Sequence, residues 1–181
     1  MLNKNILVPV ATGIEEIECV TIIDVLRRAG IGVRVCSIES REITGANGIK
    51  IIADSLFLDE VLEDYDALVL PGGTEGAERF YDYSPLVQAL TSFVKTGQLV
   101  GAICASPALV LARAGLLDTV KATCYPEYKS KLQHYQQDPV VVDGNIITSQ
   151  GPGTALAFAF KLVEILVGSK ISQKVKTGML A

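Results

Sequence analysis

The sequence predicts an α/β protein: a mostly parallel sheet with helices on both faces. Short apolar runs alternate along the chain with longer segments of helical periodicity. Those runs are apolar almost throughout, which is typical of strands buried on both faces of a sheet. The chain has 181 residues, 49% of them hydrophobic, so we expect a single domain over residues 1–181 with a substantial core.

Five apolar runs are predicted strands, at residues 6–9, 33–38, 67–70, 99–103 and 146–148. Four segments between them are predicted helices, at residues 14–29, 85–95, 105–114 and 153–167. Residues 41–52 contain Gly45 and Gly48 and are predicted to form a small hairpin. Functional residues of such sheets lie at the carboxyl ends of the strands, so the segments after the first, third and fourth strands are the candidate site.

Charge and cysteine usage exclude several classes of partner. The net charge of −4 comes without a basic patch, so neither nucleic acid nor a membrane is an expected partner. The four cysteines form no C-x-x-C pair and there is one His, so we expect no metal and no cofactor. The first apolar run is too short for a signal peptide and no run reaches membrane-spanning length, which favours the cytoplasm and reduced thiols.

Cys104 is the candidate nucleophile. It follows the strand predicted at 99–103. Pro107 is tolerated only in the first turn of a helix, so the next helix must begin close to Cys104. A cysteine at such a strand-to-helix corner has small neighbours, here Ala105 and Ser106, and a helix N-terminus that lowers the pKa of its thiol. We expect Cys19 and Cys36 to be structural, since they fall within a helix and a strand, whereas Cys124 can be structural or border the same pocket.

Two glutamates fall on the core-facing arc of the helix predicted at 14–29. Glu15 has a structural explanation, because Thr12 and Glu15 match a capping box. Glu18 has none, so either it is buried beside Cys104 and shares a proton with its sulfur, or the helix end is splayed and Glu18 is solvated. Glu16 lies outside the arc.

The same helix has a second apolar face. Ile17, Val20 and Ile23 lie off the core-facing arc, while Arg27 and Arg28 argue against complete burial of the helix. We therefore expect this face to contact a second subunit in a homodimer.

Gly72 and Gly73 end the strand predicted at 67–70. Adjacent glycines allow close backbone approach, so their N–H groups and that of Ala105 can form an oxyanion hole; a simple turn is an equal alternative. A thiol hydrolase normally uses a His as its base, but His134 lies in a polar stretch predicted to be a surface loop.

Five motifs in order resemble the ThiJ/PfpI family, in the branch of the parkinsonism-associated protein deglycase and its bacterial relatives. Each motif alone is weakly specific, but the match runs essentially end to end. The motifs are GIEEIE at 13–18, LRRAG at 26–30, VLPGG at 69–73, AICASP at 102–107 and TSQGPGT at 148–154.

This resemblance implies a flavodoxin-like three-layer sandwich that dimerises. It implies that Cys104 is nucleophile and redox-sensitive thiol, that Glu18 hydrogen-bonds it, and that the backbone of Gly73 and Ala105 stabilises an oxyanion. It further places Glu15, Tyr125 and Arg28 around the pocket, with Arg28 near the subunit boundary.

The chain departs from the family at two positions. The deglycase branch often has a His where Tyr125 stands before Pro126, and the protease-like branch has a His where Ala105 follows the nucleophile. The second departure argues against proteolysis. The resemblance therefore implies a glyoxalase III-type or deglycase-type enzyme acting on a small carbonyl substrate. The alternative is a non-enzymatic redox sensor or chaperone that responds to oxidative stress through Cys104.

Overall fold

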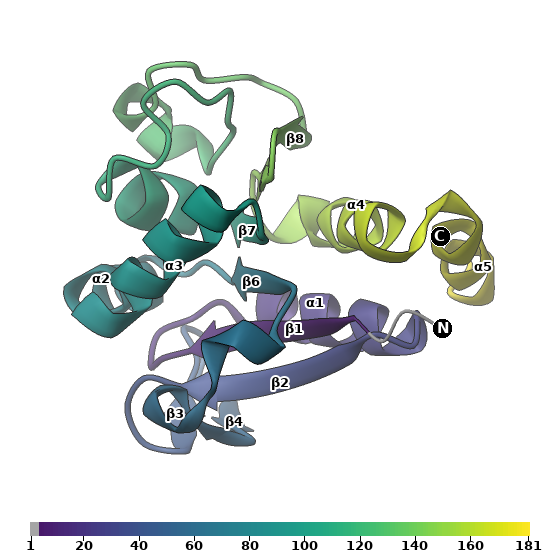
Figure 1. The fold of residues 1–181 in the computed structure, drawn as a ribbon, viewed down its shortest axis with the longest axis horizontal. Coiled ribbons are helices and arrows are strands. Elements are labelled where there is room, and N and C mark those ends of the chain that lie inside the picture. The colour runs from purple at the N-terminus through teal and green to yellow at the C-terminus, as the bar shows by residue number, and fades with distance from the viewer. Residues whose placement is uncertain (1–3) are drawn as a thin grey trace.

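The computed structural model describes residues 4–181 and contains a seven-stranded sheet (Figure 1). Its strand order is β5-β2-β1-β6-β7-β9-β8, and all neighbouring strands are parallel except the edge strand β8, which pairs antiparallel with β9. The strands are β1 (Asn5–Val10), β2 (Gly32–Ser37), β5 (Ser55–Leu56), β6 (Ala67–Leu70), β7 (Leu99–Ile103), β8 (Val140–Asp143) and β9 (Ile146–Ser149). The predicted hairpin is confirmed as β3 (Glu42–Thr44) paired with β4 (Lys50–Ile52).

Three α-helices and several shorter turns connect the strands, and two more α-helices follow the last strand of the described residues. The α-helices are α1 (Glu16–Arg28), α2 (Thr74–Asp82), α3 (Ser84–Thr96), α4 (Ala155–Val167) and α5 (Ser169–Gly178). A π-helix, η3 (Pro107–Ala112), follows β7. The 3₁₀ turns are η1 (Phe57–Asp59), η2 (Leu62–Asp64), η4 (Pro126–Lys131) and η5 (Pro152–Thr154).

The direction of the crossovers decides which face each helix covers. The chain moves from β1 to β2 in one direction along the sheet and from β6 to β7 in the other. Because such crossovers are right-handed, α1 and α3 cover opposite faces, and α4 packs against α1 (Figure 1). The five strands β2-β1-β6-β7-β9 have the flavodoxin order, so the predicted three-layer α/β fold is confirmed, with the topological switch point between β1 and β6.

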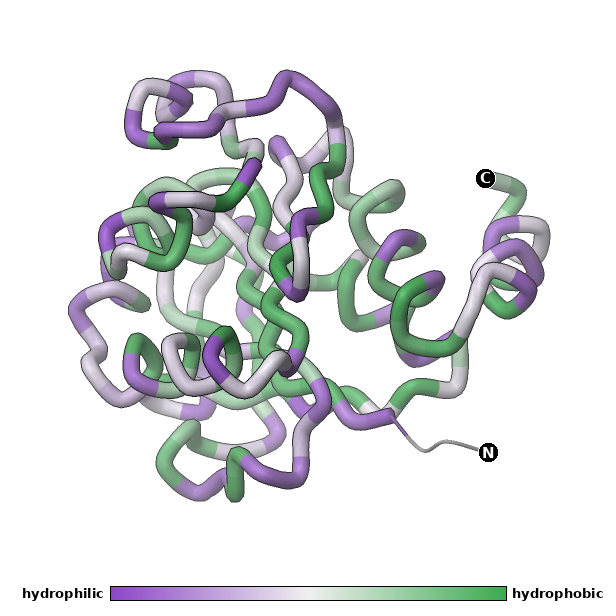
Figure 2. Tube along the Cα trace, turned by 45° about the horizontal axis from the view of Figure 1, so that its top comes forward, coloured by the Kyte–Doolittle hydropathy of each residue, from purple (hydrophilic) through white to green (hydrophobic). Residues whose placement is uncertain are grey.

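The core lies along the central strands and the inner faces of the helices. Figure 2 shows the hydrophobic residues concentrated in the strands and in α4, with hydrophilic residues in the outer loops. Gly101 of β7 makes room for α4, because a Cβ atom there would lie 3.1 Å from the ring of Phe158. Within residues 4–181, no helix combines the length and apolar character that a membrane crossing requires.

The main differences from the predicted elements have local causes. Helix α1 begins at Glu16 and not at residue 14, because Gly13 has a φ of +84° and Glu15 is extended. The helix predicted at 105–114 is the π-helix η3, and α2, α5 and the edge strand β8 were not predicted. Helices α2 and α5 are short and mostly polar, so each has few apolar residues from which a helix can be recognised.

Candidate active site

Cys104 occupies the sharp turn between β7 and η3. Its φ of +64° lies in the left-handed region that non-glycine residues rarely adopt. The Cys104 N–H donates to the Ser149 carbonyl at 3.0 Å, and the Cys104 carbonyl accepts from the Tyr125 N–H at 2.8 Å. Ser106 ties the turn to the neighbouring strand by donating to the Pro71 carbonyl at 2.6 Å. The strained corner predicted at this residue is therefore present, and it leaves the Cys104 side chain 9% exposed.

Glu18 lies in the first turn of α1 and is fully buried, as the helical wheel predicted. Its Oε2 accepts a hydrogen bond from the Gly72 N–H at 2.7 Å. Its Oε1 is buried without a hydrogen-bond partner in the part of the chain that the structure describes. A Cβ atom on Gly72 would lie 2.6 Å from Glu18 Oε2 and 2.4 Å from the Cys104 Cβ, so the carboxyl lies beside the Cys104 side chain. The splayed and solvated alternative for Glu18 is therefore wrong.

Burial controls the ionisation of this pair. Loss of solvent raises the pKa of Glu18 from 4.5 to about 7, against the opposing hydrogen bonds from Gly72 and Cys104. Burial, followed by the charge of Glu18, raises the pKa of the Cys104 thiol to about 12. The lowered thiol pKa predicted from the helix N-terminus is therefore wrong, because desolvation outweighs the stabilising N–H groups of Gly73 and Ala105. Two negative charges are disfavoured here, so the pair retains one proton at neutral pH.

Close contacts with neighbouring segments require a glycine at both position 72 and position 73. A Cβ atom on Gly72 would lie 2.4 Å from the Cβ of Cys104. Gly73 has a φ of +90°, and a Cβ atom there would lie 2.3 Å from the Gly13 carbonyl oxygen. The N–H groups of Gly73 and Ala105 favour the thiolate and partly oppose the rise of the Cys104 pKa. The site therefore combines a cysteine, a buried carboxyl and two backbone donors at the switch point of the sheet.

Glu15 lies beside this site but not in the capping arrangement predicted from the sequence. Glu15 is itself the N-cap of α1, and its Oε2 accepts from the Glu18 N–H at 2.8 Å. The capping box of Thr12 with Glu15 is wrong, because the extended backbone at Glu15 moves the helix start. Glu15 therefore orients the turn that carries Glu18.

Glu16 is a buried residue that the helical wheel left outside the core-facing arc. It is 4% exposed because the β3–β4 hairpin covers it. Its Oε1 accepts from the N–H groups of Asn47 at 2.7 Å and Ile49 at 3.2 Å, and its Oε2 accepts from Asn47 Nδ2 at 3.0 Å. Burial opposes ionisation, but these hydrogen bonds outweigh it and lower the pKa of Glu16. A long-range contact of this kind leaves no periodic signal in the sequence.

Tyr125 lies at the open side of the site, and its side chain is 42% exposed. Its ring carbon Cδ2 is 3.3 Å from the position that a Cβ atom on Gly151 would occupy, and the Glu18 Oε1 is 4.0 Å from the same position. The ring centroids of Tyr125 and Tyr128 are 6.4 Å apart, and the Tyr128 hydroxyl lies 2.9 Å from Thr74 Oγ1. Sequence analysis did not single out Tyr128 or Thr74, because only the fold brings η4 against the start of α2.

A known protein family matches most of this chain. The model of the DJ-1/PfpI family matches residues 4–165. The chain belongs to the DJ-1/PfpI family. It is 47% identical to protein DJ-1 homolog B of Arabidopsis thaliana over 92% of this chain, although the chain spans only 39% of that relative's length. The family resemblance predicted from the five sequence motifs is therefore confirmed.

Two further members bear on the site. The chain is 36% identical to the glutathione-independent glyoxalase DJR-1.2 of Caenorhabditis elegans, over 85% of this chain and 83% of that protein. The solved structure of Toxoplasma gondii DJ-1, oxidized, superposes with a TM-score of 0.94 at 40% identity and covers 98% of both chains. The DJ-1/PfpI family thus includes glyoxalase-type enzymes.

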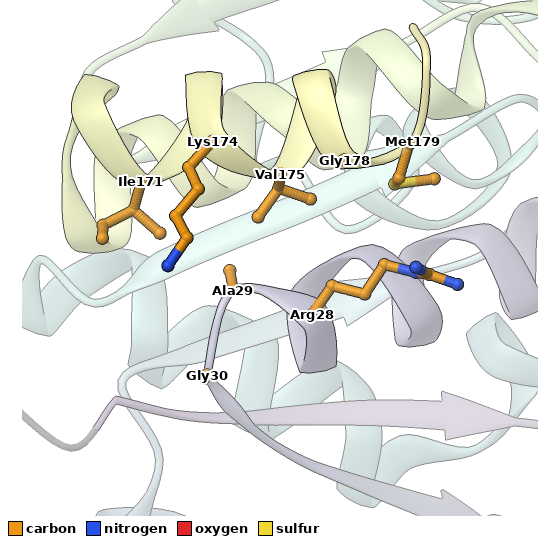
Figure 3. A pocket seen from close by; sticks show the side chains of 8 residues that line it. All are labelled: Arg28, Ala29, Gly30, Ile171, Lys174, Val175, Gly178 and Met179. Carbon is orange, nitrogen blue, oxygen red and sulfur yellow. The ribbon is translucent and has the colours of Figure 1, made fainter.

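Arg28 lies away from Cys104 in this DJ-1/PfpI chain. It ends α1, ten residues after Glu18, which corresponds to about 15 Å along the helix axis. It forms an ion pair with Asp24 at 2.6 Å. Together with Lys174 it lines a cavity of about 410 Å³ between α1 and α5 (Figure 3). Within one chain the predicted place of Arg28 in the pocket is therefore wrong, because the length of α1 separates it from the site.

The other cysteines and the His lie outside the reacting centre. Cys19, Cys36 and Cys124 are fully buried, and burial raises the pKa of each thiol. Cys124 donates to the Tyr125 carbonyl at 3.3 Å, so it borders the segment that carries Tyr125. His134 is exposed, as predicted.

Proposed function

We propose that the protein is a cysteine-dependent glyoxalase, or a related deglycase, that acts on α-oxoaldehydes without glutathione. The observation that carries this proposal is the convergence of the buried Glu18 carboxyl with the Cys104 sulfur and the N–H groups of Gly73 and Ala105. The name of the related Caenorhabditis elegans protein, a glutathione-independent glyoxalase, supports the same reaction class.

The first step is addition of sulfur to the aldehyde. The raised thiol pKa makes the form in which Glu18 holds the proton the minor form of the pair. In that form the Cys104 thiolate forms a C–S bond to C1 and the carbonyl electrons move onto oxygen. The N–H groups of Gly73 and Ala105 stabilise that oxyanion. It then takes the proton of Glu18, which leaves a neutral hemithioacetal and a Glu18 carboxylate.

Glu18 then moves a proton between adjacent carbons. Its carboxylate removes the proton of C1 and returns it to C2, while the hydroxyl proton on the C1 oxygen passes to the C2 oxygen. C1 is thereby oxidised to a thioester while C2 is reduced to an alcohol. Water hydrolyses the thioester and releases a 2-hydroxy acid with regeneration of the thiol. A carboxyl whose pKa burial has raised to about 7 suits both halves of this transfer at neutral pH.

Tyr125 occupies the position where many relatives have a His. Its exposed ring can orient a substrate oxygen or water, but a phenol is a poor base at neutral pH. Proton transfer in this scheme therefore depends on Glu18 alone.

A redox-sensing role is the second candidate. The same two N–H groups and a protonated Glu18 can donate hydrogen bonds to the oxygens of an oxidised Cys104. The related Toxoplasma gondii structure is described as oxidized. The four free thiols fit a reducing compartment, so we propose the cytoplasm as the location.

We also propose a homodimer built on α1 and the β3–β4 hairpin. Ile17 and Val20 are 58% and 53% exposed, and Ile49 and Ile52 of the hairpin are 58% and 72% exposed. Ile17 and Val20 fall on the face of α1 predicted to meet a second subunit. Burial of these side chains would stabilise the association.

Turnover of methylglyoxal to lactate by the purified protein tests the proposed function. We expect steady-state lactate formation that is abolished in Cys104→Ala and Glu18→Gln and retained in Cys36→Ala, a matched control on a different strand. Stoichiometric modification of Cys104 without turnover would favour the redox sensor.

A further inference from the structure

We infer that Tyr125 and Tyr128 form an aromatic shelf that binds the substituent on C2 of the α-oxoaldehyde and favours aryl over methyl groups. The choice of an α-oxoaldehyde rests on the proposed function. The shelf itself is defined by contacts of residues whose positions the structure describes.

The shelf is attached to both sides of the reacting centre. On one side, the Tyr125 N–H donates to the carbonyl of Cys104 itself at 2.8 Å. On the other, the Tyr128 hydroxyl pairs with Oγ1 of Thr74, which follows the oxyanion donor Gly73 directly in sequence. Each tyrosine is therefore held next to a residue of the proposed reacting centre.

The ring of Tyr125 packs against Gly151, next to the carboxyl of Glu18. Tyr125 Cδ2 and Glu18 Oε1 both lie within 4.0 Å of the place where a Cβ atom on Gly151 would stand. Gly151 is extended, with a φ of 164°, so its backbone does not demand glycine. The lack of a side chain at Gly151 therefore lets the ring of Tyr125 lie close to the carboxyl of Glu18.

The exposed part of this tyrosine pair favours a flat apolar group. The Tyr125 ring is 42% exposed and offers a π-face, with Tyr128 tilted by 50° beside it. Offset or edge-on contacts between aromatic rings are favourable beyond the area they bury, whereas a methyl group gains little from the same surface. An aryl glyoxal would place its ring on the shelf while its aldehyde carbon reaches Cys104.

Alkylation of Cys104 by two haloketones tests the shelf without requiring turnover. The probes are 2-bromoacetophenone and bromoacetone, with each rate divided by the rate for N-acetylcysteine and the modified residue identified by mass spectrometry. We expect the wild-type protein to prefer the aryl probe by about tenfold. Tyr125→Ala should reduce the preference to about one, while Tyr125→Phe, which keeps the ring, should retain it.

Gly151→Ala provides an independent variant that would displace the Tyr125 ring. Its methyl group would lie 3.3 Å from the Tyr125 ring, so we expect the aryl preference to fall while the bromoacetone rate is largely kept. An aryl preference that is absent from wild type, or unchanged by both Tyr125→Ala and Gly151→Ala, would refute the shelf.

Parallel turnover of phenylglyoxal and methylglyoxal separates the two proposals. A ratio of kcat/KM that favours phenylglyoxal and depends on Tyr125 supports both. Aryl-selective alkylation with no turnover of either aldehyde would refute the proposed enzyme and leave the shelf standing.

Discussion

The buried carboxyl of Glu18 predicts a specific dependence of stability on pH. We consider Glu18→Gln in a Cys104→Ser background, where the thiol no longer titrates and the volume of the site is nearly unchanged. Burial raises the pKa of Glu18 from 4.5 to about 7 in the folded protein. Below pH 4.5 the carboxyl is protonated in both the folded and the unfolded states, so its full contribution to stability is present there.

Stability is lost as the pH rises through the folded pKa. Between pH 4.5 and 7 the unfolded chain releases the Glu18 proton while the folded protein retains it, which favours unfolding. The difference of about 2.5 pKa units corresponds to about 3 kcal/mol at 1.36 kcal/mol per unit. Because the side chain is fully buried, solvent screening does not reduce this value.

Urea unfolding followed by circular dichroism at pH 4.5 to 8 measures the effect. Relative to the Glu18 protein, the free energy of unfolding of the Glu18→Gln variant should rise by about 3 kcal/mol from the lowest pH to the highest. Other carboxyl groups titrate equally in both proteins and cancel in the difference. Two parallel pH profiles would refute the raised pKa and with it the role of Glu18 as an acid and base near neutrality.

Four other variants or reagents test separate parts of the structure. Iodoacetamide should label Cys104 before the three fully buried cysteines, and equal labelling of all four by mass spectrometry would contradict this order. Glu16→Gln should lower the free energy of unfolding by about 1.5–3 kcal/mol, because a charged acceptor of three hydrogen bonds is lost. Unchanged urea midpoints would show that these hydrogen bonds do not stabilise the hairpin. Gly73→Ala should reduce kcat for methylglyoxal at least tenfold, because its Cβ would lie 2.3 Å from the Gly13 carbonyl oxygen; wild-type kcat would exclude Gly73 from the oxyanion hole. Ile17→Glu should convert a dimer to a monomer in light scattering, whereas a wild-type protein that is already monomeric at micromolar concentration would remove the proposed interface.

The local sequence determined the strands, the strand-to-helix corner at Cys104 and the family. Near-continuous apolar runs specified buried parallel strands because both faces of such a sheet are covered, and each run from 67–70 to 146–148 corresponds to a strand of the structure. Cys104 could be placed at a strand-to-helix corner because Pro107 restricts where a helix can start. Glu18 could be assigned to the core because helical periodicity relates it to its neighbours on α1.

Contacts between distant segments decided the rest. Glu16 is buried by a hairpin that follows it by some thirty residues, and Tyr128 meets Thr74 across a separation of 54 residues, so neither contact has a local pattern. Burial reversed the expected direction of the Cys104 pKa shift, because the desolvation of a thiol depends on all the residues that pack around it. The sequence by itself determined which residues carry the chemistry, whereas the packing of β1, β6 and β7 decided their protonation and their partners, since desolvation and hydrogen bonding are properties of the assembled site.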